Sequence, residues 1–215
     1  MRKKGRKALA LGISLLLATV SMGCSNGQQA DNLEEMPEKD TNNSPPNLMG
    51  DKDFLALIEK LNPRLDESTI ENIALTIEKY SSQYQVPTNL IISVIAAESE
   101  FHPKLLGALD DTGLMQIRLK YASYWAEMMG IEAPKTQKEL LDIDTNIHMG
   151  TFILKRLLDR YNGNMELVLV AYNAGETYVD KKIKTAQSLP TRYIKRVSNF
   201  HMELCNVPVA TALEY

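Results

Sequence analysis

Apolar residues recur at helical spacing along most of the chain after residue 50. Between residues 53 and 61, Phe54, Leu57, Ile58 and Leu61 share one face, which is the pattern of an amphipathic helix. The same spacing predicts helices over residues 70–80, 88–100, 114–129, 138–141, 147–161, 165–174 and 191–204. No segment alternates apolar and polar residues between turn signals. The sequence therefore predicts a compact all-α fold.

Polar residues at the ends of these runs predict where the helices begin and end. Ser68 with Glu71 forms a capping box, in which each side chain binds the backbone N–H of the other residue. Thr88 can cap the helix that follows Pro87. The Asn-Gly-Asn sequence at 162–164 is suited to end one helix and begin the next.

The first 50 residues differ in composition from the rest of the chain. Five basic residues lie among positions 2–7, an apolar run covers residues 8–20, and Gly23 and Cys24 follow shortly after. The run is shorter than the roughly 20 residues of a membrane-spanning helix, so it predicts a signal peptide over residues 1–23 and export. Residues 24–50 are polar and interrupted by prolines, which predicts a flexible tether.

The sequence Ser21-Met22-Gly23-Cys24 resembles the lipobox of bacterial lipoproteins, although Ser21 stands where that family prefers an aliphatic residue. The resemblance implies that Cys24 becomes the acylated first residue, and two or more acyl chains anchor a protein stably. The alternative is a signal segment without lipidation. The expected location is the cell envelope, on a membrane facing the periplasm, and Ser25 favours the outer membrane if there are two.

Charge, cysteine and histidine content narrow the classes of function. Removing residues 1–23 takes away five basic residues and no acidic one, which leaves a net charge of about −8 that repels nucleic acid. The chain has one other cysteine, Cys205, and lipidation of Cys24 excludes a disulfide between the two. Cys205 is expected to be a small buried side chain. The three histidines lie far apart, without metal-binding spacing, so the sequence predicts no metal and no cofactor.

Two glutamates near the end of one predicted helix lie on different faces. Glu98 continues an apolar stripe formed by Ile91, Val94 and Ile95. The opposite face, expected to be solvated, contains Asn89, Ser93 and Glu100. A carboxylate among aliphatic side chains is costly to ionise, so the pKa of Glu98 should rise, as a general acid requires. A structural glutamate held by hydrogen bonds is the alternative that helix geometry leaves open.

Three separated motifs add to this pattern. They are Ala-Glu-Ser-Glu-Phe at 97–101 followed by Pro103, Gly-Leu-Met-Gln at 113–116, and Ala-Tyr-Asn-Ala-Gly at 171–175. In this order they resemble the soluble-type lytic transglycosylase (SLT) domain, a relative of goose-type lysozyme. Weaker features of that family are Asn146-Ile147 with Gly150, the 161–164 break, and Thr-Arg-Tyr at 191–193. The domain is expected over residues 87–204, with N-terminal helices over 51–86 packed on it and a tail at 205–215.

The resemblance implies a lysozyme-like fold whose helices line an active-site cleft. Glu98 would be the catalytic acid/base, and Ser99 would lie beside it in the site. The substrate-binding residues it implies are Ser99, Met115, Gln116, Tyr172, Asn173 and Tyr193, with Tyr193 approaching the Glu98 carboxylate. Packing in the core is the alternative role of Met115 and Tyr193.

The chain departs from the family around the second motif. Ile117-Arg118-Leu119 follows the glutamine, where the family often has an aliphatic residue and then Met-Pro. Asp110-Asp111-Thr112 precedes Gly113 in place of small residues. The resemblance therefore leaves open how this loop contacts a substrate.

The implied reaction is cleavage of peptidoglycan glycan strands. Glu98 would protonate the oxygen between N-acetylmuramic acid and N-acetylglucosamine, and the 6-hydroxyl of the muramic acid would then close a 1,6-anhydro ring. One carboxylate is enough when the N-acetyl group of the substrate assists. Two alternatives stay open: a hydrolytic muramidase in which Asp110 or Asp111 positions a water, and a catalytically silent peptidoglycan-binding lipoprotein.

Overall fold

The computed structural model describes residues 47–205, and helices make up most of this segment. The predicted signal peptide, Cys24 and the tether up to residue 46 lie outside the described residues. In chain order the elements are η1 (Leu48–Gly50), α1 (Lys52–Leu61), α2 (Glu67–Tyr84), α3 (Thr88–Ser99), β1 (Asp111–Thr112), β2 (Ile117–Arg118), α4 (Leu119–Met129), α5 (Gln137–Leu140), α6 (Ile143–Arg160), α7 (Met165–Ala174), α8 (Glu176–Lys184) and α9 (Arg192–Cys205). The predicted helical fold is confirmed.

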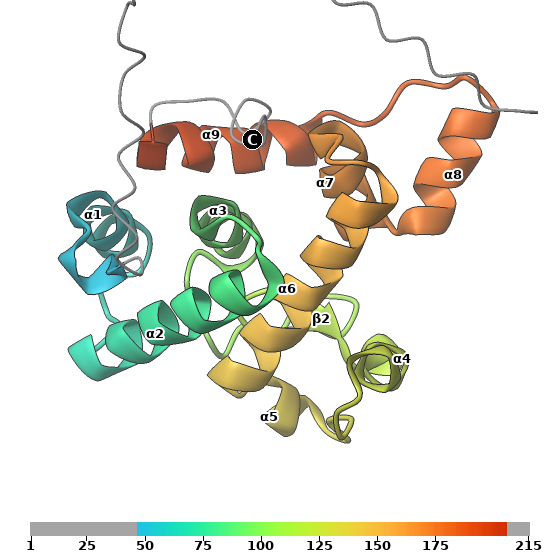
Figure 1. The fold of residues 1–215 in the computed structure, drawn as a ribbon. Coiled ribbons are helices and arrows are strands. Elements are labelled where there is room, and N and C mark those ends of the chain that lie inside the picture. Colours follow the sequence, from blue (N-terminus) through green and yellow to red (C-terminus); the bar gives the residue numbers. More distant parts are fainter. Residues whose placement is uncertain (1–46, 206–215) are drawn as a thin grey trace, which may run out of the picture. The chain divides into compact units, whose positions relative to one another are not determined.

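Helix α3 is surrounded by other elements (Figure 1). Helix α9 packs against it, α2 packs on another side, and α6 packs against α2. All residues from Leu90 to Ala97 are buried as a result. Ser93 was expected on a solvated face, but it is fully buried and donates a hydrogen bond to the Asn89 carbonyl at 2.6 Å. Only Glu100 on that face is exposed, because neighbouring helices cover the helix on all sides before its last turn.

Two of the predicted helix caps are wrong. Helix α2 begins at Glu67, because the Asp66 carboxylate accepts the Thr69 N–H at 2.9 Å and takes the position expected for Ser68. Thr88 lies in the first turn of α3 and does not cap it. Its hydroxyl instead lies 2.9 Å from that of Ser81 on α2.

Other helix boundaries are set by capping side chains, which the spacing of apolar residues does not predict. Helix α6 begins before the predicted residue 147, because Asp142 accepts the N–H of Thr145 at 2.9 Å. The predicted break after α6 is confirmed, since Asn164 accepts the Leu167 N–H and caps α7. Helix α8 was not predicted. Only Val179 among its residues is fully buried, so its apolar stripe is weak.

The predicted helix over 114–129 begins only at Leu119. Residues 111–118 form a short antiparallel hairpin instead, with Asp111 opposite Arg118 and Thr112 opposite Ile117. Gly113 and Gln116 in its turn have φ values of 76° and 49°, which a right-handed helix does not allow. The hairpin is therefore an exception to the expected all-α fold.

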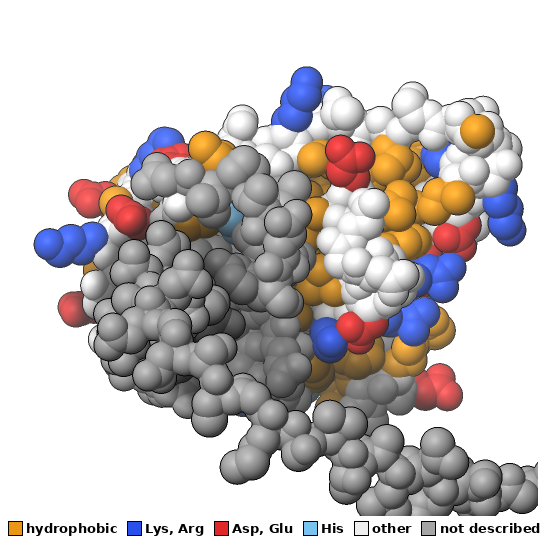
Figure 2. All heavy atoms as spheres, turned by 45° about the horizontal axis from the view of Figure 1, so that its top comes forward, with side chains coloured by type: hydrophobic (Ala, Val, Ile, Leu, Met, Phe, Trp, Pro, Cys, Tyr) orange, Lys and Arg blue, Asp and Glu red, His pale blue; other side chains and the backbone are white. Residues whose placement is uncertain are grey.

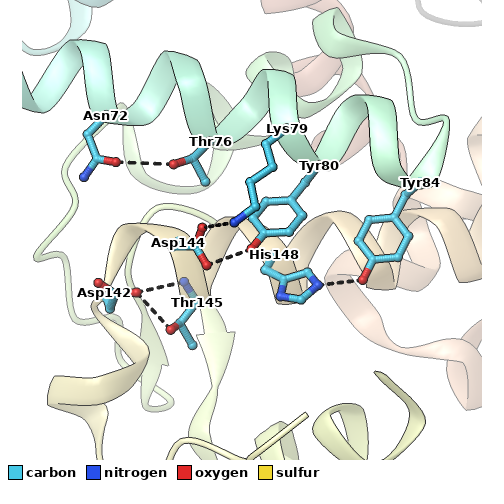
Figure 3. Close-up of polar contacts among 9 residues, drawn as sticks. All are labelled: Asn72, Thr76, Lys79, Tyr80, Tyr84, Asp142, Asp144, Thr145 and His148. Atoms are coloured by element: carbon cyan, nitrogen blue, oxygen red, sulfur yellow. Dashed lines mark hydrogen bonds and ion pairs between the residues drawn. The ribbon is translucent and has the colours of Figure 1, made fainter. Parts of the chain in front are cut away.

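A polar and aromatic cluster joins α2 to α6 (Figure 3). His148 stacks on Tyr80 with ring centroids 4.1 Å apart, and its Nε2 lies 2.6 Å from the Tyr84 hydroxyl. Tyr80 and Lys79 both donate to Asp144 at 2.7 Å. Burial lowers the pKa of His148, so a neutral ring is favoured in this interface.

The surface described by residues 47–205 carries charges of both signs. On the face in Figure 2, acidic and basic side chains are interspersed among hydrophobic ones. Within the same residues, no helix combines the length and apolar character that crossing a bilayer requires. Cys205 ends α9 half-buried, with its Sγ 3.0 Å from the His201 carbonyl oxygen.

Candidate active site

A cavity of about 580 Å³ lies between the end of α3, the hairpin, α4, α7 and the start of α8. This volume falls in the range of sites that hold small or oligomeric ligands. The polar and aromatic residues on its wall include Glu98, Asp111, Gln116, Arg118, Tyr121, Tyr124, Trp125, Tyr172 and Asn173. Three elements that carry the sequence motifs therefore meet at one cavity.

Glu98 reaches this cavity from the last turn of α3. The helix ends directly after it, because Glu100 and Phe101 adopt left-handed backbone angles of 49° and 58° in φ. Burial raises the pKa of Glu98 to about 7, and the negative charge of Asp111 acts in the same direction. A carboxyl group with this pKa is present in both protonation states near neutral pH, so it can donate and accept a proton.

Tyr193 joins Glu98 from α9. Its hydroxyl donates a hydrogen bond to the Glu98 carboxylate at 2.6 Å, and this bond favours the ionised form of the acid. Burial, together with the charge of Glu98, raises the pKa of Tyr193 well above its usual value. The phenol therefore remains a proton donor toward Glu98 at neutral pH.

The Gly113–Gln116 turn is fixed by one buried amide. The Asn146 side chain accepts the Met115 N–H and donates to the carbonyls of Thr112 and Leu140, each at 2.8 Å. A Cβ at Gly113 would lie 2.5 Å from the Asn146 amide nitrogen, so this position requires glycine both for its positive φ and for space. Asn146 thus ties the wall of the cavity to α6.

The residues expected to bind substrate separate into three groups. Gln116, Tyr172 and Asn173 line the cavity with Glu98. Tyr193 is not part of the cavity wall and contacts Glu98 through its hydroxyl. Met115 and Ser99 do not line the cavity either, which corrects the expectation that they face a substrate. Ser99 is buried, and its hydroxyl donates to the carbonyl of Ile95, one helical turn earlier, at 3.2 Å.

Met115 is buried because it packs against α6. A Cβ added at Gly150 would overlap the Met115 sulfur, so this glycine makes room for the side chain. Only the backbone of Met115 is directed to the site, where its carbonyl accepts the Tyr172 hydroxyl at 3.0 Å. The packing role that was left open for Met115 is the one the structure shows.

Several residues on the wall were not identified as functional from the sequence. Arg118 donates from Nε to Asp111 at 2.6 Å across the hairpin, and both side chains line the cavity. The aromatic residues of α4 line it too, at Tyr121, Tyr124 and Trp125. The unusual sequence around 110–119 was the available signal for the ion pair, whereas the aromatic residues could not be separated from ordinary helix residues.

The wall of the cavity carries carboxyl, phenol, amide and guanidinium groups. Between residues 47 and 205, no three His, Cys, Asp or Glu side chains come together in a way that could hold a metal ion.

Comparison with known proteins gives a consistent family. Residues 75–195 match the family described as the transglycosylase SLT domain. Over 98 residues the chain is 31% identical to the soluble lytic murein transglycosylase of Escherichia coli (strain K12). The matched segment covers 46% of this chain and 15% of that protein. The chain is 31% identical over 107 residues to membrane-bound lytic murein transglycosylase C of Serratia proteamaculans (strain 568), covering 46% of this chain and 30% of that protein.

The fold is similar to a solved structure from the same group. The 70 kDa soluble lytic transglycosylase from Escherichia coli superimposes with a TM-score of 0.50 and 25% identity, over 63% of this chain and 22% of that one. This chain therefore spans less than a third of the length of these relatives.

The family match begins within α2, upstream of residue 87, where the motifs had placed the start of the domain. It includes α3, the hairpin and α7, which form much of the cavity wall. Since the match covers more than half of its 215 residues, the chain belongs to the transglycosylase SLT domain family.

Proposed function

We propose that this protein is a lytic murein transglycosylase that cleaves the bond between N-acetylmuramic acid and N-acetylglucosamine in peptidoglycan, for remodelling or turnover of the cell wall. The observation that carries the proposal is Glu98, a half-buried carboxyl with a pKa of about 7 at the wall of the cavity, hydrogen-bonded to Tyr193. Such a group can serve as acid and base in turn.

The reaction needs two proton transfers at Glu98. In the first, protonated Glu98 donates to the glycosidic oxygen, the bond to the anomeric carbon breaks, and the N-acetyl oxygen of the muramic acid bonds to that carbon. In the second, ionised Glu98 takes the proton of the 6-hydroxyl as its oxygen displaces the N-acetyl group and closes the anhydro ring. The Tyr193 hydrogen bond stabilises the carboxylate that exists between the two steps. Gln116, Tyr172 and Asn173 would hold the sugars.

The hydrolytic alternative would use Asp110 or Asp111 as a second carboxylate, and Asp110 is exposed and not part of the cavity wall. Asp111 does line the same cavity, but its carboxylate accepts a hydrogen bond from Arg118 at 2.6 Å. Arg118 therefore already occupies one oxygen of the carboxylate that the hydrolytic reaction would need. This pairing favours the internal nucleophile over an activated water. A silent binding protein is disfavoured because it would have no need for an acid with a raised pKa.

The identity of the chain ends tests this function. Digestion of purified sacculi should give muropeptides that end in 1,6-anhydro-N-acetylmuramic acid, because the ring closes without water. Mass spectrometry distinguishes these ends from reducing ends by the mass of one water molecule. Mainly reducing muramic acid ends would support the muramidase, and the absence of released glycan would support the silent protein.

The pH dependence of the rate should follow the ionisation of Glu98. Because the first step needs its protonated form, kcat/KM should fall as the pH rises through about 7, the pKa of Glu98. Tyr193→Phe removes a hydrogen bond that lowers this pKa, so the falling limb should move to higher pH. The rate should also drop by about tenfold, because the intermediate carboxylate loses a charge-assisted hydrogen bond. A limb that stays in place in the variant would show that the hydroxyl does not act on Glu98.

We propose further that Cys24 carries the lipid that anchors the protein to a membrane of the cell envelope, the outer one if there are two. The support is the order of basic, apolar and Gly-Cys segments in residues 1–24. Cys24→Ala should abolish fatty-acid labelling and release the protein from the membrane fraction. Cys205→Ala is the matched control and should remain labelled. Labelling that persists without Cys24 would contradict the anchor.

A further inference from the structure

Arg118 is the only basic side chain among the described residues that line the cavity. It lies on β2 directly opposite Asp111 on β1. Its Nε donates to the Asp111 carboxylate at 2.6 Å, and the two side chains remain 30% and 24% exposed. The guanidinium is therefore fixed at one edge while part of it stays open to the cavity.

The ion pair leaves most of the hydrogen-bonding capacity of Arg118 unused. An arginine side chain has five N–H donors in a planar fork, which suits two-point binding of a carboxylate. Only Nε is engaged by Asp111, and within residues 47–205 the two Nη groups make no hydrogen bond to another residue. Four donors are thus available on a guanidinium that Asp111 already holds in place.

Arg118 shares the cavity with exposed aromatic side chains that can pack against a sugar. Tyr121 and Tyr124 on α4 line the same cavity with about half of their surfaces exposed. Flat aromatic faces of this kind offer apolar area together with a polar hydroxyl. Arg118 is also near enough to Glu98 for its charge to favour the Glu98 carboxylate. A ligand group bound by Arg118 would therefore belong to a sugar in the same cavity as Glu98.

A muramic acid unit carries a lactyl group on its ring, and the state of this group depends on the stem peptide. In a peptide-free strand the lactyl group ends in a carboxylate close to the sugar. In a peptide-bearing strand the same carbon is a neutral amide, and the acidic groups lie farther out along the peptide. Resting on the proposed function, we propose that Arg118 binds the lactyl carboxylate of peptide-free glycan and makes such strands the preferred substrate.

The experiment compares the full-length protein with three variants on two substrates. The substrates are glycan strands freed of peptide by an amidase and strands that retain their stem peptides. Arg118→Gln should lower kcat/KM on peptide-free strands by about tenfold, mainly through KM, since a half-exposed charge-assisted hydrogen bond is lost. Arg118→Lys should restore part of this loss. On peptide-bearing strands both variants should lose clearly less activity, because the lactyl group is a neutral amide there and gives Arg118 no carboxylate to bind.

Asp111→Asn separates recognition from a merely structural ion pair. If the pair only holds the hairpin together, Arg118→Gln and Asp111→Asn should lower activity in the same way on both substrates, and the proposal would be overturned. If Arg118 binds a carboxylate, Asp111→Asn removes a competing negative charge, so the preference for peptide-free strands should persist or increase. A loss confined to peptide-bearing strands would assign the contact to a peptide carboxylate and would also overturn the proposal.

Binding without turnover keeps this test apart from that of the proposed function. Titration calorimetry with a peptide-free glycan fragment, in a Glu98→Gln background, should show about tenfold weaker binding when Arg118→Gln is added. Converting the lactyl carboxylate of the fragment to its amide should remove that difference. A difference that survives amidation would overturn the role of Arg118. Failure of the reaction itself would appear separately, as wild-type protein that binds the fragment but releases no anhydro ends.

Discussion

Glu98→Gln should reduce the initial rate of sacculus solubilisation by roughly 10²- to 10⁴-fold, or more, because one residue performs both proton transfers. The amide has the shape of the acid and can still accept the Tyr193 hydroxyl, but it has no proton to transfer at neutral pH. Glu100→Gln, at the residue that caps the end of the same helix, is the matched control. Glu100 is exposed and makes a half-exposed ion pair with Arg196 at 3.3 Å, so its loss should leave the rate nearly unchanged.

The same substitution should increase the free energy of unfolding by an amount that depends on pH. The pKa of Glu98 is about 7 in the folded protein, against an ordinary value of 4.5. Between these values the folded state holds a proton that the unfolded state has released, so the wild type loses stability as the pH rises through this window. Glu98→Gln escapes this loss, and its advantage in free energy of unfolding should approach about 3 kcal/mol above pH 7 and vanish near pH 4.

Thermal midpoints and rates of the two variants, measured side by side at both pH values, check these expectations. An active Glu98→Gln protein would mean that another group supplies the proton. A folded but inactive Glu100→Gln protein would mean that the face with Glu100, and not the face with Glu98, takes part in the reaction. A stability gain that is equal at pH 4 and pH 8 would show that ionisation of Glu98 is not its cause.

Asn146→Ala should lower the free energy of unfolding by about 3 to 5 kcal/mol, since it removes three buried hydrogen bonds to backbone groups. The groups are the Met115 N–H and the carbonyls of Thr112 and Leu140, and Asn146 itself is fully buried. Activity should fall further than folding alone requires, because the same amide holds the turn whose Met115 carbonyl accepts the Tyr172 hydroxyl.

Two further variants sharpen this expectation, with urea unfolding as the measurement. Asn146→Asp keeps the acceptor for Met115 but turns a carboxylate toward two carbonyl oxygens, so it should be at least as destabilising. Asn72→Ala is the control, because Asn72 is exposed on α2 and has only a 3.4 Å contact with Thr76. Its effect should stay within about 0.5 kcal/mol. Similar unfolding curves for Asn146→Ala and Asn72→Ala would contradict the role given to the buried amide.

The sequence determined most of the helices and the order of the motifs by itself. Residues one helical turn apart lie on the same face, so the spacing of apolar residues predicts a helix directly. It placed α7 at its observed bounds and located α1, α3 and α9 closely. The spacing failed where local polar groups decide, as at Asp66 and Asp142, whose carboxylates begin helices earlier than the apolar stripe does. It also failed for α8, which buries too little surface to show a stripe.

Only the tertiary structure decided which side chains reach the cavity. Glu98, Arg118 and Asn173 come from three elements that are distant in the chain, and helical periodicity carries no information about which elements will meet. The Gly113–Gln116 turn appears in the sequence as part of an apolar run, but the buried Asn146 amide and the space left by Gly150 hold it out of the helix and send Met115 into the core. Whether a residue contacts a ligand or a neighbouring helix depends on what packs against it, and that is a property of the assembled fold.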